Sequence, residues 1–343
     1  MRYTLLGDSG LRVSEISLGT MTFGPDWGFG ADSSDSRAQF EYYAEAGGNF
    51  IDCAVNYTNG TAEAYLGELL TGQRDRWVLS TKYSLSTNPS DPNASGNSRK
   101  NLRNSLEKSL RRLKTDYIDV YWLHAWDFMT SPVEVMSALD DAVHSGKVLY
   151  VGISDSPAWV VARLQTIAEL RGWSPFIGLQ IEYSLAQRDP ERELLPMAHA
   201  LGLGVTAWGP LAGGVLTGKY AAPASSVSPR RHGDHADPSR VRIGAAVVEV
   251  AGALGATPAQ VALAWVSTRN VIPIIGARTT AQLADSLGSL ELVLEPEHLD
   301  ALDAASAPVL GFPHDFLARD DIGGLVYGET RGLIDLPPGR RPV

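Results

Sequence analysis

The chain has 343 residues, a length that allows one large barrel or two ordinary domains. Hydrophobic residues make up 44% and charged residues 20%, which is typical of a soluble globular protein. The formal net charge of -10 argues against nucleic acid or an anionic membrane as the main partner.

The amino terminus and the cysteine content bear on location. The first residues lack the apolar run of a signal peptide, and no stretch reaches the length of a transmembrane helix. The single cysteine, Cys53, cannot form an intrachain disulfide, and we interpret it as a small buried hydrophobe. We therefore expect a cytoplasmic protein.

The chain opens with short extended segments. Residues 3–6 and 11–13 flank Asp8-Ser9-Gly10 and predict a hairpin, which the first buried strand follows at 16–19. A glycine-rich loop at 24–33 leads to a helix that Ser33 or Ser34 can cap and that Gly47-Gly48 ends near residue 46.

Strands and helices then alternate along the chain. With the first, the expected strands are 16–19, 49–53, 77–82, 117–123, 149–153, 176–181, 204–208 and 271–275. The expected helices between and after them are 61–71, 98–114, 132–145, 157–171, 190–202, 258–269 and 279–288. This order predicts an α/β fold with a parallel sheet, and a (β/α)8 TIM barrel is favoured as a single domain over 1–343. No Gly-x-Gly-x-x-Gly turn follows the first strand, which argues against a Rossmann domain.

Three segments depart from this alternation. Residues 86–98 and 221–240 are polar loops, and a loop as long as the second is typically a lid or disordered. The second loop contains Arg230-Arg231-His232-Gly233-Asp234-His235, whose ligand types lack regular spacing, so we predict a solvated loop and no metal site. The Gly- and Pro-rich tail from Val309 is expected to lie across the barrel surface.

Four polar residues follow successive strands of the predicted barrel. Asp52 and Tyr57 come after the second strand, Lys82 ends the third and His124 ends the fourth. Each alone is more simply a structural or solvated side chain, but the carboxyl ends of neighbouring parallel strands converge. An ammonium beside a phenol favours the phenolate, and a carboxylate holds the ammonium in place. The set predicts a proton-donating site aimed at a carbonyl oxygen.

These residues carry a resemblance to the aldo-keto reductases, a (β/α)8 family that uses a nicotinamide cofactor. Residues 3–20 resemble the start of its bacterial aryl-alcohol-dehydrogenase-like and potassium-channel-β-like branches, and the four polar residues match the catalytic tetrad in order and spacing, over roughly residues 3–310. The resemblance implies that Tyr57 is the general acid, that Lys82 lowers its pKa and that Asp52 pairs with Lys82. His124 would orient the carbonyl.

The resemblance also implies a set of residues that bind NADP(H). They are Thr20, Met21, Asp52, Ser154, Asp155, Gln180, Trp208, Gly209, Pro210, Leu211, Ala212, Gly213, Lys219, Gly276, Arg278, Gln282, Asp285 and Ser286. Ser154, Asp155 and Gln180 would contact the carboxamide, Trp208 would stack on the nicotinamide, and the glycine run would lie along the pyrophosphate.

Arg278 stands at the start of the helix after the eighth strand, where the family grips the 2′-phosphate. NADPH is therefore expected over NADH. This chain departs from common family residues at Asp155 and Ser286, where Asn is frequent, and at Gly209, where Ser is common. An ionised Asp155 can accept from the carboxamide NH2 but cannot donate to its carbonyl.

The leading hypothesis is NADPH-dependent reduction of aldehydes, with ketones as further candidates, together with the reverse alcohol oxidation. The expected substrate pocket is lined by Met21, Trp27, Tyr57, His124 and Trp126, whose tryptophans favour an apolar substrate flank. The partner would then be a small carbonyl compound, while the oligomeric state stays open.

Two alternatives were weighed against the reductase. One is a cofactor-sensing regulatory subunit like the channel-β branch, in which Asn replaces the tetrad histidine, whereas His124 is intact here. The other is a metal-assisted barrel hydrolase, which needs several His, Asp or Glu at strand ends that strands five to eight do not supply.

Overall fold

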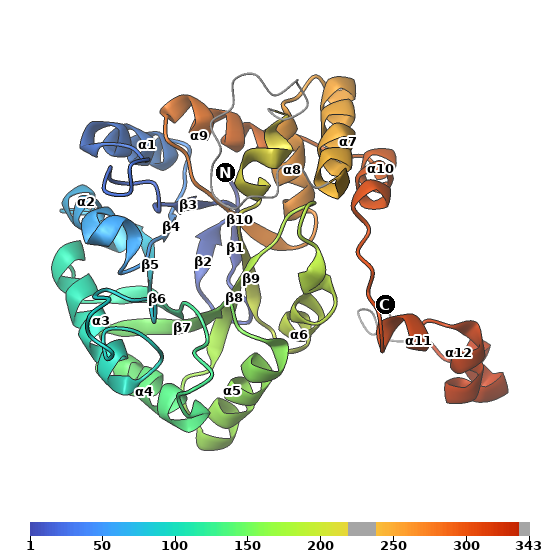
Figure 1. The fold of residues 1–343 in the computed structure, drawn as a ribbon, viewed down its shortest axis with the longest axis horizontal. Helices are drawn as coiled ribbons and strands as arrows, with labels where there is room; N and C mark the ends of the chain where they lie inside the picture. The colour runs from blue at the N-terminus through green and yellow to red at the C-terminus, as the bar shows by residue number, and fades with distance from the viewer. Residues whose placement is uncertain (219–237, 336–343) are drawn as a thin grey trace.

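Eight parallel strands close into a barrel in the computed structural model, which describes residues 1–218 and 238–335 (Figure 1). Around the barrel β10 pairs with β3 and with β9, and the other neighbours are consecutive. The strands are β3 (Ser17–Gly19), β4 (Phe50–Asp52), β5 (Val78–Tyr83), β6 (Ile118–Leu123), β7 (Val148–Ser154), β8 (Phe176–Glu182), β9 (Gly204–Trp208) and β10 (Val271–Ile275). The predicted (β/α)8 fold and all eight predicted strands are confirmed.

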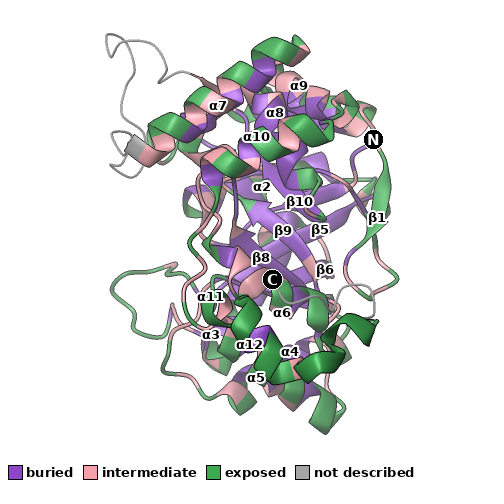
Figure 2. Cartoon of the chain, turned by 90° about the vertical axis from the view of Figure 1, so that its right-hand side faces the viewer, coloured by how far each residue is buried: buried purple, intermediate pink, exposed green. Residues whose placement is uncertain are grey.

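Helices surround the strands, buried on their inner faces and exposed outside (Figure 2). They are α1 (Ser33–Glu45), α2 (Thr61–Leu69), α3 (Arg99–Leu113), α4 (Pro132–His144), α5 (Ala158–Arg171), α6 (Leu194–Ala200), α7 (Pro238–Leu254), α8 (Pro258–Ser267), α9 (Thr280–Leu287) and α10 (Pro296–Ser306). Within the described ranges no single helix is long and apolar enough to cross a membrane, and α7 and α8 reach that composition and length only as a pair bent by 99°.

Trp122 of β6 fills the barrel interior. The ring packs where β7 and β8 carry glycine, since a Cβ on Gly152 or Gly178 would lie 2.2 or 2.8 Å from its atoms. Lys82 of β5 is the register neighbour of Trp122, one strand away. The indole therefore forms an apolar floor beneath the strand ends that carry the polar residues.

The predicted hairpin, β1 (Tyr3–Leu5) and β2 (Arg12–Ser14), lies across the start of the strands. Leu6 and Val13 are fully buried there. Gly7 sits so close to the start of β9 that an added Cβ would lie 2.6 Å from the Gly204 nitrogen. The hairpin thus closes the amino-terminal end of the barrel and leaves the carboxyl ends of the strands as the accessible mouth.

Two local expectations need correction. The cap of α1 is Asp32, not Ser33 or Ser34, because its carboxylate accepts from the Asp35 N–H at 2.9 Å. The predicted 221–240 loop is too long at its end, since α7 begins at Pro238, while the rest of it, including the Arg230–His235 stretch, lies outside the described residues.

The carboxyl-terminal tail forms α11 (His314–Leu317) and α12 (Asp320–Tyr327). Figure 1 shows α12 standing away from the barrel, so the expectation of a tail lying across its surface is wrong for this helix. The start of the tail is held where Arg192 donates to the Val309 carbonyl and His314 contacts Glu193.

Candidate active site

Lys82 brings three of the four predicted catalytic residues together. Its ammonium donates to Asp52 Oδ2 at 2.7 Å, to the Cys53 carbonyl at 2.8 Å and to the Tyr57 hydroxyl at 3.0 Å. These contacts use all three N–H donors of a side chain that is fully buried. The lysine is therefore held in one position between a carboxylate and a phenol, as the convergence of strand ends predicts.

His124 faces the same phenol from the end of β6. Its ring centroid lies 6.0 Å from that of Tyr57, with the planes at 78°. The imidazole is buried, and its Nδ1 has no hydrogen-bond partner among the described residues. The imidazole therefore lies edge-on to the ring of the proposed proton donor.

Asp52 has further partners besides the lysine. Its Oδ1 accepts from the Gln180 amide at 3.0 Å and from the Ser80 hydroxyl at 3.4 Å. Gln180, which the resemblance assigns to the carboxamide, thus reaches across from β8 to orient the carboxylate. The backbone carbonyl of Asp52 also accepts from the Thr20 hydroxyl at 2.9 Å, which ties β3 to the site.

The predicted nicotinamide-side residues lie on adjoining strand ends. Ser154 ends β7, and its hydroxyl is buried without a partner in the described part of the chain. Asp155 follows it and accepts from the Trp208 indole N–H at 2.9 Å. Asp155 therefore contacts the predicted stacking tryptophan, and the buried Ser154 hydroxyl adjoins it in the chain.

The aldo/keto reductase family matches residues 15–307 of this chain. The chain belongs to that family. Norsolorinic acid reductase of Aspergillus flavus is 38% identical over 325 residues, covering 91% of this chain and 83% of that protein. Norsolorinic acid reductase stcV of Emericella nidulans is 39% identical over 321 residues, with 90% and 82% covered.

The name of a third relative includes a cofactor. Aryl-alcohol dehydrogenase [NADP(+)] of Phanerodontia chrysosporium is 34% identical over 362 residues, which cover 97% of this chain and 93% of that protein. The relatives are reductases and dehydrogenases. This aldo/keto reductase is therefore an oxidoreductase, which favours the enzyme over the regulatory alternative.

Burial and the neighbouring charges oppose each other in setting the pKa of Tyr57 and of Lys82. It raises the pKa of Tyr57 to about 12, although the Lys82 ammonium pulls the other way. For Lys82 burial favours the neutral form, but Asp52 and Tyr57 outweigh it and leave the pKa above its ordinary value. Lys82 thus acts on the Tyr57 pKa in the predicted direction, and burial of the phenol acts against it.

Burial, with the nearby Lys82 charge, holds the pKa of His124 well below its ordinary value. The imidazole is therefore neutral at pH 7. Below pH 6.5 the histidine binds a proton in the unfolded chain but not in the folded chain. This residue therefore makes the folded protein less stable as the pH falls. We expect the free energy of unfolding to drop by up to about 1.4 kcal/mol per pH unit from this group alone.

Urea denaturation of wild type and His124→Gln between pH 7.5 and 5 measures this contribution. The free energy of unfolding should fall less steeply with decreasing pH in the variant than in wild type, because a glutamine does not titrate. Identical slopes for the two proteins would show that His124 does not contribute.

One buried ion pair at the site was not anticipated from the sequence. Glu63 of α2 is fully buried and accepts from the Thr81 hydroxyl at 2.8 Å and from Arg112 of α3 at 3.2 Å. Arg112 also donates to the Val55 carbonyl at 2.8 Å. The pair braces the segment that carries Tyr57 against two helices. A charged residue inside an apolar helical face was its only signal in the sequence.

The remaining predicted cofactor residues follow β9 and β10, which are neighbours in the barrel. Gly209 to Gly213 form a tight turn, with φ of 65° at Gly209 and 64° at Gly213, but Lys219 lies outside the described residues. Just before α9 the backbone N–H of Arg278 donates to the side-chain oxygen of Gln282. Within α9 the Asp285 carboxylate accepts from the side chains of Thr257 and Gln260, at the start of α8.

The turns that carry two further predicted residues, Met21 and Gly276, are tied together by their neighbours. Thr22 donates to the Ala277 carbonyl at 2.6 Å, so the turn after β3, with Met21, adjoins the Gly276 turn. Ser286 is buried in α9. The segments predicted to bind one cofactor therefore lie on adjacent loops of the mouth.

Aromatic side chains flank the tetrad. Trp27 lies edge-on to Tyr57 with ring centroids 6.4 Å apart, which places the predicted pocket residue beside the proton donor. Trp126 is half-buried, and its backbone N–H contacts the Asp155 carbonyl at 3.4 Å. Both tryptophans are thus at the mouth as predicted.

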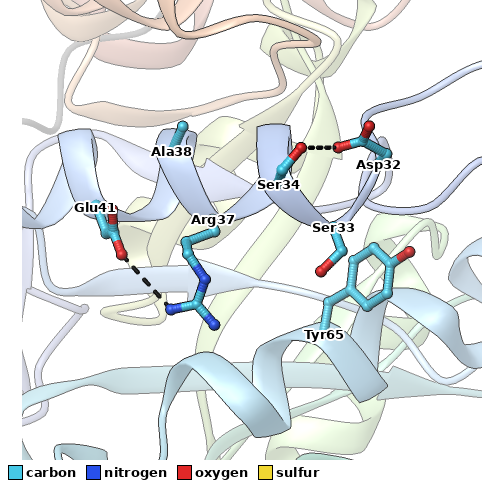
Figure 3. A pocket seen from close by; sticks show the side chains of 7 residues that line it. All are labelled: Asp32, Ser33, Ser34, Arg37, Ala38, Glu41 and Tyr65. Atoms are coloured by element: carbon cyan, nitrogen blue, oxygen red, sulfur yellow. Dashed lines mark hydrogen bonds and ion pairs between the residues drawn. The ribbon is translucent and has the colours of Figure 1, made fainter.

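Hollows are present both at the mouth and on the outer helices of the described structure. One, of about 630 Å³, adjoins Asp155 and Trp208 at the mouth. The other is an open groove between α1 and α2, drawn in Figure 3, where Tyr65 stands beside Ser33 and the Arg37–Glu41 pair. The groove lies on the outer helices, so only the first hollow belongs to the site.

Proposed function

We propose that this reductase reduces aldehydes, and ketones as a second class, with NADPH as hydride donor and Tyr57 as general acid. The observation that carries the proposal is the buried Lys82 ammonium, 3.0 Å from the Tyr57 hydroxyl and paired with Asp52. The reverse reaction, oxidation of the alcohol, uses the same groups.

The proton step follows from the protonation states. A phenol whose pKa is about 12 remains protonated at neutral pH and is therefore ready to donate. The alkoxide that forms when a carbonyl accepts hydride is a stronger base than a phenolate, so the proton moves to it. Lys82 then stabilises the phenolate that remains, and the fixed ammonium needs no rearrangement to do so.

His124 supports the same oxygen. As a neutral imidazole it can donate one N–H while the other ring nitrogen accepts. A donor beside Tyr57 orients the substrate carbonyl for protonation.

The residues fit a nicotinamide cofactor, which supplies the hydride when bound. The unpartnered Ser154 hydroxyl offers a hydrogen bond to the carboxamide, and the Trp208 face offers a stacking surface. Arg278, beside the start of α9, offers a guanidinium to the 2′-phosphate.

An aromatic carbonyl is the proposed substrate class. One relative, the aryl-alcohol dehydrogenase, is named for an aromatic alcohol. Trp27 and Trp126 offer apolar surface next to the proposed acid. A cytoplasmic location remains an expectation, with which the buried Cys53 thiol agrees.

The test follows NADPH oxidation by absorbance over a panel of aromatic and aliphatic aldehydes and ketones. Turnover that is fastest for aromatic aldehydes supports the proposal. If NADPH binds but no carbonyl compound is reduced, the reductase function is wrong.

Arg278→Ala should weaken NADPH binding about 10- to 100-fold and leave NADH binding almost unchanged, because only NADPH has the 2′-phosphate. Binding titrations with both cofactors measure this. Arg171→Ala on α5 serves as the matched control, since its guanidinium lies near Trp173 and away from the mouth. Equal losses for the two cofactors would contradict the phosphate assignment.

A further inference from the structure

Asp155 is fixed by contacts from three neighbouring segments. Its carboxylate accepts from the Trp208 indole at 2.9 Å. Its backbone N–H donates to the Gln180 carbonyl at 3.3 Å, and its own carbonyl accepts from the Trp126 N–H at 3.4 Å. Its φ of 35° lies in the left-handed region, which aspartate and asparagine tolerate better than most residues.

The bond to Trp208 determines where the carboxylate stands. An acceptor of an indole N–H lies in the plane of the ring at its edge. The ring itself is 37% exposed and lines the cavity of about 630 Å³ together with Asp155 and Glu182. A second ring stacked on the indole would therefore have the carboxylate beside it.

We propose that Asp155 makes the reductase prefer the oxidised over the reduced nicotinamide, because its negative charge lies beside the ring that stacks on Trp208. This inference rests on the proposed function. The ring of the oxidised cofactor carries a positive charge and that of the reduced cofactor is neutral, so the charge acts on one form only.

The surrounding charges leave this effect in place. Lys82 is a cation that lowers the pKa of Asp155, and it is paired with Asp52. Arg192 also lines the cavity, and it is paired with Asp189. Glu182 lines the same cavity and has the same sign as Asp155. Burial raises the pKa of Asp155 and the Trp208 hydrogen bond opposes this rise, so the measurements are made at pH 8 to favour the ionised form.

Asp155→Asn is the decisive variant. Asparagine keeps an acceptor for the indole N–H and tolerates the left-handed backbone, so the variant removes the charge and keeps the geometry. The dissociation constant for NADP+ should rise about three- to tenfold, while that for NADPH changes less than about twofold. The ratio of the two constants is the readout.

Asp189→Asn is the matched control. Asp189 lies on the outer rim of the cavity, its side chain is 63% exposed and it pairs with Arg192. Solvent screens such a carboxylate, so this variant should keep the wild-type ratio.

Each other outcome has a definite meaning. An unchanged ratio in Asp155→Asn overturns the inference, as do equal losses for both forms, which would leave Asp155 with a structural role only. If wild type binds neither form, the proposed function fails as well. Near-ultraviolet circular dichroism of the cofactor-free variant, if altered from wild type, would show that the indole has moved and would overturn the claim that the charge acts alone.

Discussion

Tyr57→Phe should lower kcat for aldehyde reduction about 100- to 10,000-fold, the usual contribution of a positioned general acid. The hydroxyl it removes lies 3.0 Å from the Lys82 ammonium and is the only hydroxyl of the described residues that this ammonium contacts. The fold should survive, because the ring keeps its packing beside Trp27 and His124. NADPH oxidation in the steady state measures the loss, and a binding titration shows whether the cofactor still binds.

Tyr117→Phe is the matched control for this variant. Tyr117 precedes β6 at the opposite end of the barrel, where its hydroxyl bonds to Asp75 at 3.1 Å. It should retain wild-type kcat. Full activity in Tyr57→Phe would contradict the proposed acid, and equal losses in both variants would point to a general effect of tyrosine replacement.

Lys82→Met should both unfold more easily and lose activity. It leaves the Asp52 carboxylate, whose side chain is 5% exposed, without its cation. Removing one partner of a buried pair costs about 3–5 kcal/mol of unfolding free energy. Urea denaturation measures this loss, and a variant as stable as wild type would show that the pair does not stabilise the fold.

The double variant Lys82→Met with Asp52→Asn separates stability from catalysis. Because it removes both charges, most of the lost stability should return, while the activity should not. A double variant that regains activity would show that Lys82 does not assist Tyr57.

The fold was predictable because its signals are local. Buried strands such as 118–123 are runs of β-branched and aromatic residues, and helices such as 99–113 repeat leucine on one face. The tetrad was predictable for a similar reason. Each member ends or follows a strand, and parallel strands place their carboxyl ends at one mouth.

The features that escaped prediction depend on contacts between distant residues. Gln180 bonds to Asp52 across 128 positions of sequence, and nothing near either residue announces the partner. Glu63 was hidden in a helix whose apolar face gave the dominant signal. The direction in which the Tyr57 pKa shifts depends on how deeply the folded chain buries the phenol. That burial outweighs the positive charge of Lys82, which the sequence does reveal.

The hairpin across the start of the barrel has a practical consequence for protein engineering. A Cβ on Gly7 would lie 2.5 Å from the Gly202 carbonyl oxygen, and a Cβ on Gly204 would lie 2.4 Å from the Gly7 nitrogen, so neither Gly7 nor Gly204 can accept a larger side chain. Libraries intended to change substrate range should therefore leave this end untouched and vary the loops after β3 and β6, where Trp27 and Trp126 stand. Affinity tags are better fused at the carboxyl terminus, because Met1 packs against the core beside Gly47 and a fusion there would press on the hairpin.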